Sequence, residues 1–385
     1  LGRSRWDADA LRDLVRDYAL ETLAAPDAVL VIDETGFLKQ GTSSCGVQRQ
    51  YTGSAGKITN CQIGVFAAYV SDRGHAFIDR RLYLPESWTE QPDRLRAAHV
   101  PEDVRFATKP AIAVAMIERV LKAGVSFAWV AADSVYGVGQ VEKILRRAGK
   151  GYVLGVTATH PFRSWGKKPG WSGTTETIAA SLPPPAYVRL SAGDGTKGPR
   201  LYDWAYLELA DLEAEDVGYA RSPTVWPRGV LIRRSLADQS LAFFTTWCPQ
   251  GTPLAVLVRV EGCRWAIEDG FETAKNELGL DHHETRSTAP LSTAWLAPPR
   301  LAGDARLRPA DGDPPPGEHH PATPQKRSAG TTSPMVRWSV QEIRRLAVRL
   351  AQRRIEPASV IAWSIWRRCH QAMAQRAHLK RALQL

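Results

Sequence analysis

Two apolar runs that each end in an aspartate are the strongest constraint on how this chain folds. The run Val29–Ile32 leads into Asp33, and the run Phe127–Ala132 leads into Asp133. Consecutive apolar residues are typical of a strand that is buried on both faces of a sheet. An ionised carboxylate at the end of such a strand needs water, a cation or a hydrogen-bond donor. Either each strand ends in a turn, which Gly36 favours for the first, or the two aspartates lie side by side at a sheet edge and hold a metal ion.

The segments around these runs alternate between helix and strand patterns. They predict helices over residues 7–23, 108–124 and 138–148, and strands over 61–70, 75–84 and 151–156. Thr108 suits the N-cap of the second helix, and Gly124 suits its end. The turn sequence SDRG predicts that the first two of these strands form a hairpin beside the strand that ends at Asp33. The stretch Gly53–Thr59 lacks the spacing of a phosphate-binding loop and is predicted to be a turn. The alternation predicts an α/β protein.

A third carboxylate lies on a predicted helix that follows a β-rich stretch. Residues 157–253 contain strand-like runs separated by Gly, Pro and Ser clusters and predict a β-rich insertion. Helical patterning then resumes, and CRWAIEDGFETAK places Arg264, Glu268 and Lys275 on one side of a helix. Together with the two aspartates, Glu268 would complete a set of ligands that Mg²⁺ prefers. Without the aspartates, the same segment is typical of an exposed, salt-bridged helix.

Composition and charge indicate which partners the chain can have. No apolar segment is long enough to cross a bilayer, and the five cysteines lie far apart without metal-binding or disulfide-framework spacing. Ten of the 26 prolines lie between Pro290 and Pro334, so residues 287–334 predict a loop or disorder. Residues 335–385 predict basic amphipathic helices with eleven Lys or Arg and two Glu, out of a net charge of +10 for the chain. Such a segment attracts nucleic acid, although a solvated helix face explains the charge equally well.

Four motifs carry a resemblance to a known family. The sequences VIDETGFLKQG, YTGSAGKITNCQIGVF, VAADSVYG and RWAIEDGFETAKNELGLDHHETR resemble the DDE transposases of bacterial insertion sequences, in the branch called insertion-sequence family 701. This branch belongs to a supergroup with a Tyr-x2-Arg-x3-Glu-x6-Lys signature. The resemblance spans roughly residues 5–286. It implies a ribonuclease-H-like mixed sheet with a β-rich insertion before the helix that bears the last carboxylate.

The resemblance also implies roles for individual residues. By motif, Asp33, Asp133 and Glu268 correspond to the catalytic, metal-binding triad, and Arg264 and Lys275 correspond to residues that contact DNA phosphates. The implied cofactor is Mg²⁺ or Mn²⁺, as two ions that clamp the attacking and leaving oxygens of a displacement at phosphorus. The implied partner is double-stranded DNA, at the element ends and at the target, and whether a homodimer forms stays open. No membrane is involved, and the implied location is the bacterial cytoplasm, in association with the nucleoid.

The chain departs from this pattern at three places. Glu261 occupies the tyrosine position of the signature. Relatives carry a further N-terminal segment, so an N-terminal truncation is expected, and the Pro-rich segment replaces an expected apolar helix, as a shifted reading frame would produce. The expected division is a catalytic core over residues 1–156 and 254–286, the insertion 157–253, the Pro-rich segment 287–334 and the basic helical tail 335–385. Three functions therefore remain: a transposase, a catalytically inactive DNA-binding relic, or another nuclease of the same fold.

Overall fold

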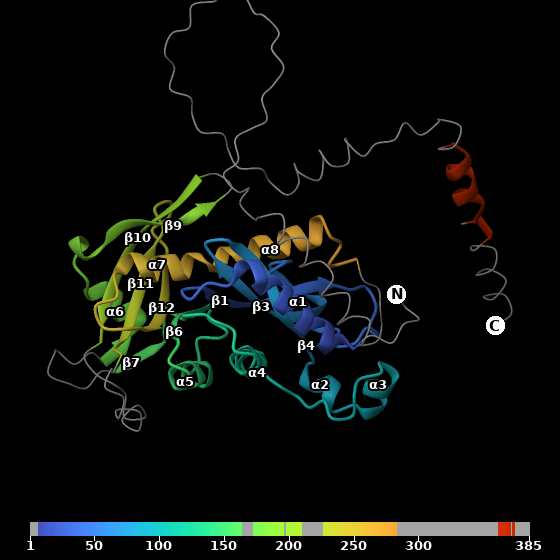
Figure 1. The fold of residues 1–385 in the computed structure, drawn as a ribbon, viewed down its shortest axis with the longest axis horizontal. Coiled ribbons are helices and arrows are strands. Elements are labelled where there is room, and N and C mark those ends of the chain that lie inside the picture. The colour runs from blue at the N-terminus through green and yellow to red at the C-terminus, as the bar shows by residue number, and fades with distance from the viewer. Residues whose placement is uncertain are drawn as a thin grey trace, which may run out of the picture. The chain divides into compact units, whose positions relative to one another are not determined.

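The computed structural model describes residues 7–163, 172–195, 198–209, 226–282, 361–370 and 372–373. The chain divides into two compact units, Leu1–His319 and His320–Leu385. In the first unit, the described residues form a large mixed sheet with helices on both faces (Figure 1). Among the helices of the described ranges, none is long and apolar enough to span a membrane.

Ten strands of the described chain make up the main sheet. They are β1 (Val29–Leu38), β2 (Gln48–Thr52), β3 (Lys57–Ser71), β4 (Gly74–Tyr83), β5 (Trp129–Ala132), β6 (Gly151–Val156), β9 (Val188–Gly195), β10 (Gly198–Glu208), β11 (Arg228–Arg234) and β12 (Leu241–Trp247). Their order is β2-β3-β1-β5-β6-β12-β11-β10-β9, and β4 pairs with the other part of β3. The strands β1, β5 and β6 are parallel, and the remaining pairs are antiparallel. The predicted α/β class with a mixed sheet is confirmed, and strands of the β-rich stretch continue the same sheet through the β12–β6 pair.

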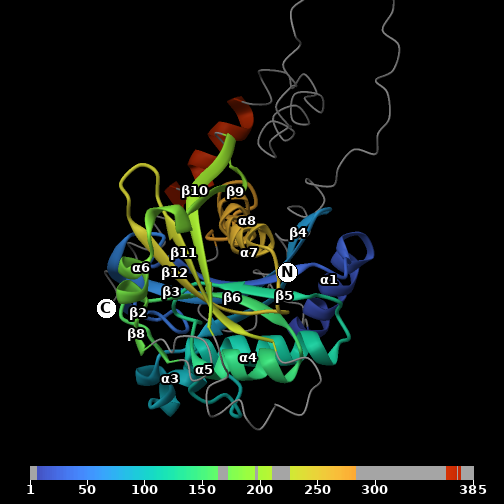
Figure 2. The same ribbon diagram turned by 90° about the vertical axis from the view of Figure 1, so that its left-hand side faces the viewer.

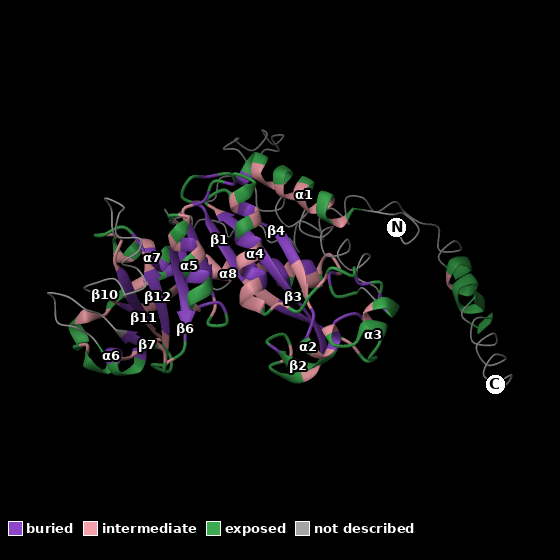
Figure 3. Ribbon diagram, turned by 90° about the horizontal axis from the view of Figure 1, so that it is seen from below, coloured by how far each residue is buried: buried purple, intermediate pink, exposed green. Residues whose placement is uncertain are grey.

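The helices lie in layers on the two sides of this sheet. They are α1 (Ala8–Leu23), α2 (Glu86–Thr89), α3 (Pro92–Ala97), α4 (Lys109–Lys122), α5 (Gly139–Arg147), α6 (Thr175–Ser181), α7 (Leu254–Gly262) and α8 (Arg264–Asn276). Strands β7 (Pro161–Arg163) and β8 (Ser172–Thr174) form a separate pair, and Pro184–Ala186 is a 3-10 turn. Two perpendicular views place α7 and α8 on one face of the sheet and α4 and α5 on the other (Figure 2). The central strands between these layers are buried (Figure 3).

The first strand is longer than the sequence predicts. β1 continues through Asp33 to Leu38, because β3 pairs with it along its whole length, up to the Leu38–Cys61 pair. The prediction that the strand ends at Asp33 and turns at Gly36 is therefore wrong. Gly36 lies within the strand, where a Cβ atom would come within 2.0 Å of Thr52 Oγ1. The glycine therefore permits the close approach of β1 to the end of β2.

Elsewhere the periodic segments fold as their sequence predicts. The hairpin is formed by β3 and β4, and β3 begins four residues before the predicted Cys61. The helix predicted to begin at Thr108 is α4, in which the Thr108 side chain accepts a hydrogen bond from the Ala111 backbone at 3.2 Å. This cap satisfies one of the free N–H groups at the helix start and fixes where the chain enters the helix.

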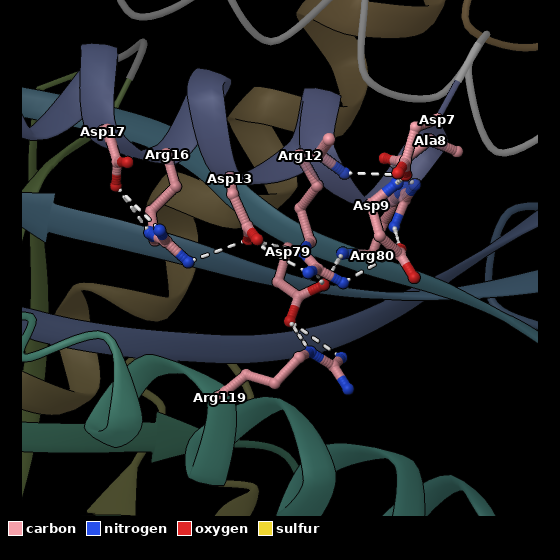
Figure 4. A network of polar contacts seen from close by, with 11 residues as sticks. Asp7, Ala8, Asp9, Arg12, Asp13, Arg16, Asp17, Asp79, Arg80 and Arg119 are labelled. Carbon is pink, nitrogen blue, oxygen red and sulfur yellow. Dashed lines mark hydrogen bonds and ion pairs between the residues drawn. The ribbon is translucent and has the colours of Figure 1, made fainter.

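A buried aspartate ties two helices to the edge of the sheet (Figure 4). Asp79 on β4 is 3% exposed, and its Oδ2 lies 2.8 Å from Arg119 Nη2 of α4. Its Oδ1 accepts from the Arg80 backbone at 2.7 Å and lies 4.0 Å from Arg12 Nε of α1. The Arg80 side chain in turn donates to the Ala8 carbonyl at 2.8 Å. A buried carboxylate with these partners fixes the positions of α1 and α4 on β4.

In the second unit, the described residues 361–370 and 372–373 are helical. They fall within the second of the two predicted basic helices, and their Trp363 and Trp366 side chains are 60% and 61% exposed. The rest of the predicted tail and the whole Pro-rich segment 287–334 lie outside the described residues.

Candidate active site

The structure brings Asp33, inside β1, and Asp133, directly after β5, together on two neighbouring parallel strands. The last register pair between β1 and β5 is Ile32 with Ala132, so each aspartate is the next residue along its strand. Neighbouring strands lie about 4.8 Å apart, so the two residues are adjacent across the sheet. Their charges interact strongly enough for Asp133 to raise the pKa of Asp33.

Both carboxylates lie on the face of the sheet that α7 and α8 cover. Val31 and Ala131, two residues before the aspartates, belong to the core that packs against α7 and α8. The residues directly before the aspartates belong to the core on the α4 and α5 side. Because side chains alternate between the faces of a strand, Asp33 and Asp133 lie on the side of α8.

Asp33 has a strongly perturbed pKa. Its side chain is 14% exposed, its Oδ1 accepts from the Glu34 backbone at 2.7 Å, and its Oδ2 lies 4.0 Å from Arg264 Nη2. The pKa of Asp33 is raised to about 7, chiefly because the group is buried; the charge of Arg264 lowers this pKa and the charge of Asp133 raises it. The local groups therefore compensate only part of the negative charge that the two aspartates would carry, which is a property of sites that bind cations.

The next residue along β1, Glu34, holds the turn that carries Asp133. Glu34 Oε2 accepts a hydrogen bond from the Tyr136 hydroxyl at 2.8 Å, and Oε1 pairs with Lys109 Nζ at the start of α4. Tyr136 is fully buried, and its backbone N–H donates to the Asp133 carbonyl at 3.2 Å. Val135 also donates its backbone N–H to Asp133 Oδ1 at 2.9 Å. One carboxylate thus links β1, α4 and the turn after β5.

Helix α8 is packed firmly onto the face that holds the aspartates. The Phe271 ring centroid lies 5.2 Å from that of Phe66 on β3 and 5.1 Å from that of Phe77 on β4. A Cβ atom at Gly270 would lie 3.1 Å from the Phe77 ring, so the glycine lets α8 approach this ring closely. His75 Nε2 of β4 also lies 3.5 Å from Asp269 Oδ2. These contacts determine which side of α8 meets the sheet.

The predicted stripe on α8 runs along β1. Arg264 at the start of the helix reaches Asp33, and Lys275 near its end reaches the Thr35 hydroxyl at 2.6 Å. Glu268 lies between them on the same stripe and is exposed. Within the part of the chain that the structure describes, no three His, Cys, Asp or Glu side chains come close enough to hold a metal ion. The geometry thus brings Asp33, Asp133 and Arg264 together and does not gather Glu268 into the same cluster.

Lys275 donates to three oxygens of the protein. In addition to the Thr35 hydroxyl, its Nζ lies 3.0 Å from the Gly36 carbonyl and 3.0 Å from Ser54 Oγ. An ammonium group has three protons, so these acceptors match its full donor capacity. Burial lowers the pKa of Lys275, and the charge of Asp281 opposes this shift. The side chain therefore fastens the loop of Ser54 to β1 at Thr35 and Gly36.

Glu261, at the tyrosine position of the signature, links α7 to the strands of the β-rich stretch through Arg233 of β11. Glu261 at the end of α7 is 2% exposed, and its Oε1 lies 2.7 Å from Arg233 Nη1 on β11. Burial raises the pKa of Glu261, the charges of Arg233, Arg264 and Arg200 lower it, and Glu268 raises it. A carboxylate here thus holds a group of arginines from β10, β11 and α8 beside the candidate site.

Some residues of this site were missed by reasoning from the sequence. No motif assigns a role to Glu34, although its position on the opposite face of β1 from Asp33 follows from strand alternation. Ser54, Thr35 and Arg233 carry no motif, because their roles arise from contacts between distant segments. Glu261 also has a signal in the sequence, as a charged residue in the largely apolar helix α7 that requires a partner when it is buried.

The comparisons with known proteins support a DDE transposase or endonuclease. Residues 1–177 match the family model described as DDE superfamily endonuclease, which includes both aspartates and ends before α8. A protein of Microchaete diplosiphon named "Probable transposase for insertion sequence element IS701" is 31% identical over 163 residues. This match covers 42% of the present chain and 40% of that protein, so the chain spans less than half the length of the relative.

Two solved structures share a low level of similarity. The piggyBac transposase synaptic complex with hairpin DNA gives a TM-score of 0.36 at 10% identity, covering 74% of this chain and 47% of that one. The NurA nuclease from Sulfolobus solfataricus gives a TM-score of 0.28 at 9% identity, covering 67% and 80%. Both TM-scores are too low to carry an argument about fold or function.

Proposed function

We propose that this chain is a DDE transposase that cleaves and transfers DNA strands at the ends of an insertion sequence. The observation that carries this proposal is that Asp33 and Asp133 each follow the last register pair of the parallel strands β1 and β5, on the face that α8 covers. Both residues lie within the region that matches a DDE superfamily endonuclease. The match covers only 40% of the length of the Microchaete diplosiphon protein, so the activity of the whole protein is part of this proposal.

A ribonuclease-H-like core is part of the proposal. The strand order β4-β3-β1-β5-β6 supports it, since a meander of three antiparallel strands is followed by two parallel strands with α4 and α5 as crossovers. In this arrangement the first and fourth strands of the core lie next to each other and each carries one aspartate. The fold alone does not establish the chemistry, which has to be argued from the site.

The site residues fit divalent cations. Asp33 is nearly buried, its pKa is raised to about 7, and it lies next to a second carboxylate. Oxygen ligands of this kind suit Mg²⁺ or Mn²⁺, and Asp33 and Asp133 would hold two such ions together with Glu268. In the described part of the chain, Glu268 is exposed on the α8 stripe and lies outside the cluster of the two aspartates. When bound, the ions would supply Lewis-acid stabilisation of the attacking and leaving oxygens at phosphorus.

The cationic residues of α8 would orient the DNA backbone. Arg264 lies at the site with its guanidinium 4.0 Å from Asp33 and would bind a phosphate oxygen beside the scissile bond. Lys275 would contribute its charge, because its ammonium protons already point at Thr35, Gly36 and Ser54. Arg264 would therefore bind the substrate, and Lys275 would organise the Ser54 loop.

A nicking assay tests the proposal. The parent protein is expected to nick supercoiled DNA when Mg²⁺ or Mn²⁺ is present, and Asp33→Ala or Asp133→Ala is expected to abolish nicking while DNA binding persists. Asp93→Ala serves as the matched control, since the Asp93 side chain is 93% exposed on α3. Equal nicking by either active-site variant and the parent would contradict the assignment.

A strand-joining assay separates the proposed transposase from another nuclease of the same fold. A transposase joins a cut 3′ end to target DNA, whereas a nuclease only cleaves. A catalytically inactive DNA-binding protein would bind DNA without either reaction, and the separation of Glu268 from the aspartates is the observation that favours this alternative.

A further inference from the structure

We propose that the hairpin of residues 48–61, formed by β2 and the start of β3, is a docking element for double-stranded DNA next to the active site. The inference rests on the proposed function for the identity of the substrate. It names the surface that binds the duplex beside the scissile phosphate. Four observations support it: the charge of this segment, its exposed side chains, its two-stranded geometry and its attachment to β1.

The segment around the hairpin contains no acidic residue. From Thr35 to Ser71, 37 residues, there is no Asp or Glu, whereas the whole chain has 40 acidic residues in 385. The same stretch contains Lys39, Arg49 and Lys57. A phosphate backbone attracts such a segment through its cations, and no carboxylate opposes that attraction.

The hairpin also exposes apolar and aromatic side chains. Tyr51 is 61% exposed, and Ile58, its register partner on β3, is 60% exposed. Arg49 and Lys57 are exposed on the same two strands. Paired residues of an antiparallel ladder have Cβ atoms about 5 Å apart, so Tyr51 and Ile58 form one surface patch. Because side chains alternate along a strand, Arg49 lies on the face of this patch, and Lys57 lies on the other face of the ribbon. An aromatic ring beside a cation suits contact with the sugars and bases of DNA.

The geometry of the hairpin suits a groove of the duplex. β2 is the last strand in the order of the sheet, and its partners on β3 are Lys57–Cys61. The pairing of β3 with β1 begins only at Cys61, so the part of β3 before Cys61 forms a two-stranded ribbon with β2. The major groove of B-DNA admits a two-stranded ribbon of this kind. The ribbon therefore has both the charge and the shape that duplex DNA requires.

The loop of the hairpin is fastened close to the aspartates. Ser54 Oγ lies 3.2 Å from Thr35 Oγ1, 3.3 Å from the Gly36 carbonyl and 3.0 Å from Lys275 Nζ. Thr35 is two residues beyond Asp33 on β1, which corresponds to about 7 Å along a strand. Lys275 thus connects the hairpin, β1 and α8, and DNA bound to the hairpin would lie at a set distance from the aspartates.

Binding measurements with matched variants test the docking element. The probe is a short fluorescent duplex, and the readout is its affinity as a function of salt concentration without divalent metal. The slope of log K against log salt is negative, and each lost phosphate contact reduces its magnitude by about 0.9. The double variant Arg49→Ala, Lys57→Ala is expected to reduce the magnitude of the slope by about 2 and to weaken binding. The control Arg96→Ala, Arg105→Ala removes two exposed cations near α3 and is expected to leave the slope unchanged. An unchanged slope in the hairpin variant would overturn the proposal.

A photocrosslink distinguishes DNA from a second copy of the chain. Edge strands also pair with other strands, so β2 could join a second protein molecule instead. With Tyr51→p-benzoylphenylalanine, a crosslink to the duplex supports the docking element. A crosslink only to another copy of the chain, or no crosslink to either, overturns it. Because this readout needs no cleavage, crosslinking without metal-dependent nicking would retain the DNA-binding surface and reject only the proposed phosphoryl transfer.

Discussion

Asp33→Asn is expected to stabilise the metal-free protein at high pH. Asp33 has a folded-state pKa of about 7, against an ordinary value of 3.8, chiefly because it is buried. The folded state therefore holds a proton that the unfolded state releases, and the stability from this group is lost as pH rises from about 4 through about 7. Tenfold in proton affinity corresponds to about 1.4 kcal/mol, so the full shift corresponds to about 4 kcal/mol. Asparagine has nearly the same shape as aspartate and cannot ionise. Above pH 7 the variant should therefore avoid most of the cost, about 4 kcal/mol, of burying the ionised Asp33.

Denaturant unfolding at several pH values measures this effect. In the presence of a chelator, the free energy of unfolding of Asp33→Asn should exceed that of the parent by an amount that grows between about pH 4 and about pH 7 and is constant above that. Divalent metal should stabilise the parent at the upper pH by compensating the ionised aspartate, and it should stabilise the variant much less. Asp93→Asn, with a side chain that is 93% exposed, should show no pH-dependent difference.

One result would refute the reasoning. If Asp33→Asn is less stable than the parent at about pH 8 without metal, then the carboxylate is stabilised by its neighbours and burial is not its dominant influence. A difference that does not change with pH would lead to the same conclusion. Either outcome would also remove the main argument that the site has an uncompensated charge for a cation.

Three further substitutions test the contacts around the site. Lys275→Met should reduce duplex affinity and its salt dependence, because the change removes a charge and frees the loop of Ser54. Ser54→Ala keeps the charge and should reduce both quantities less, so equal effects of the two changes would contradict a role for the charge of Lys275. Tyr136→Phe removes the hydrogen bond to Glu34 and should lower the free energy of unfolding by about 1–3 kcal/mol and slow nicking several-fold. As the control, the salt dependence of duplex binding should be the same in this variant and in the parent. Asp79→Ala should lower the free energy of unfolding by about 3–5 kcal/mol in denaturant titrations, since it leaves buried guanidinium groups without their carboxylate; a loss under about 1 kcal/mol would show that solvent replaces it.

Local patterns accounted for the elements with strong periodicity or clear caps. The helix after Thr108 and the hairpin of β3 and β4 follow from residues that are close in sequence. The end of β1 could not be predicted in this way. Whether residues after Asp33 continue a strand depends on a partner strand, and β3 supplies that partner up to Cys61. Gly36, which indicates a turn when considered alone, instead permits contact with Thr52.

The candidate site shows the same division between local and distant contacts. The adjacency of Asp33 and Asp133 could be predicted, because each follows an apolar run that forms one of two neighbouring parallel strands in an α/β unit. The stripe of Arg264, Glu268 and Lys275 could also be predicted from helical spacing. What each cation of this stripe contacts could not, because that depends on how α8 packs against β1.

By itself, the sequence determined the apolar strands, the aspartates that follow them and the spacing of charged residues on one helix, since each depends on the periodicity of a short segment. Only the tertiary structure decided that Lys275 fastens the Ser54 loop to β1 and that Glu34 holds the turn of Asp133. Lys275 and Thr35 are 240 residues apart in the chain, and their contact exists only because the aromatic packing of α8 on β3 and β4 positions the helix along β1. Periodicity describes which side of an element is buried, whereas the partner of each polar group depends on the packing of whole elements.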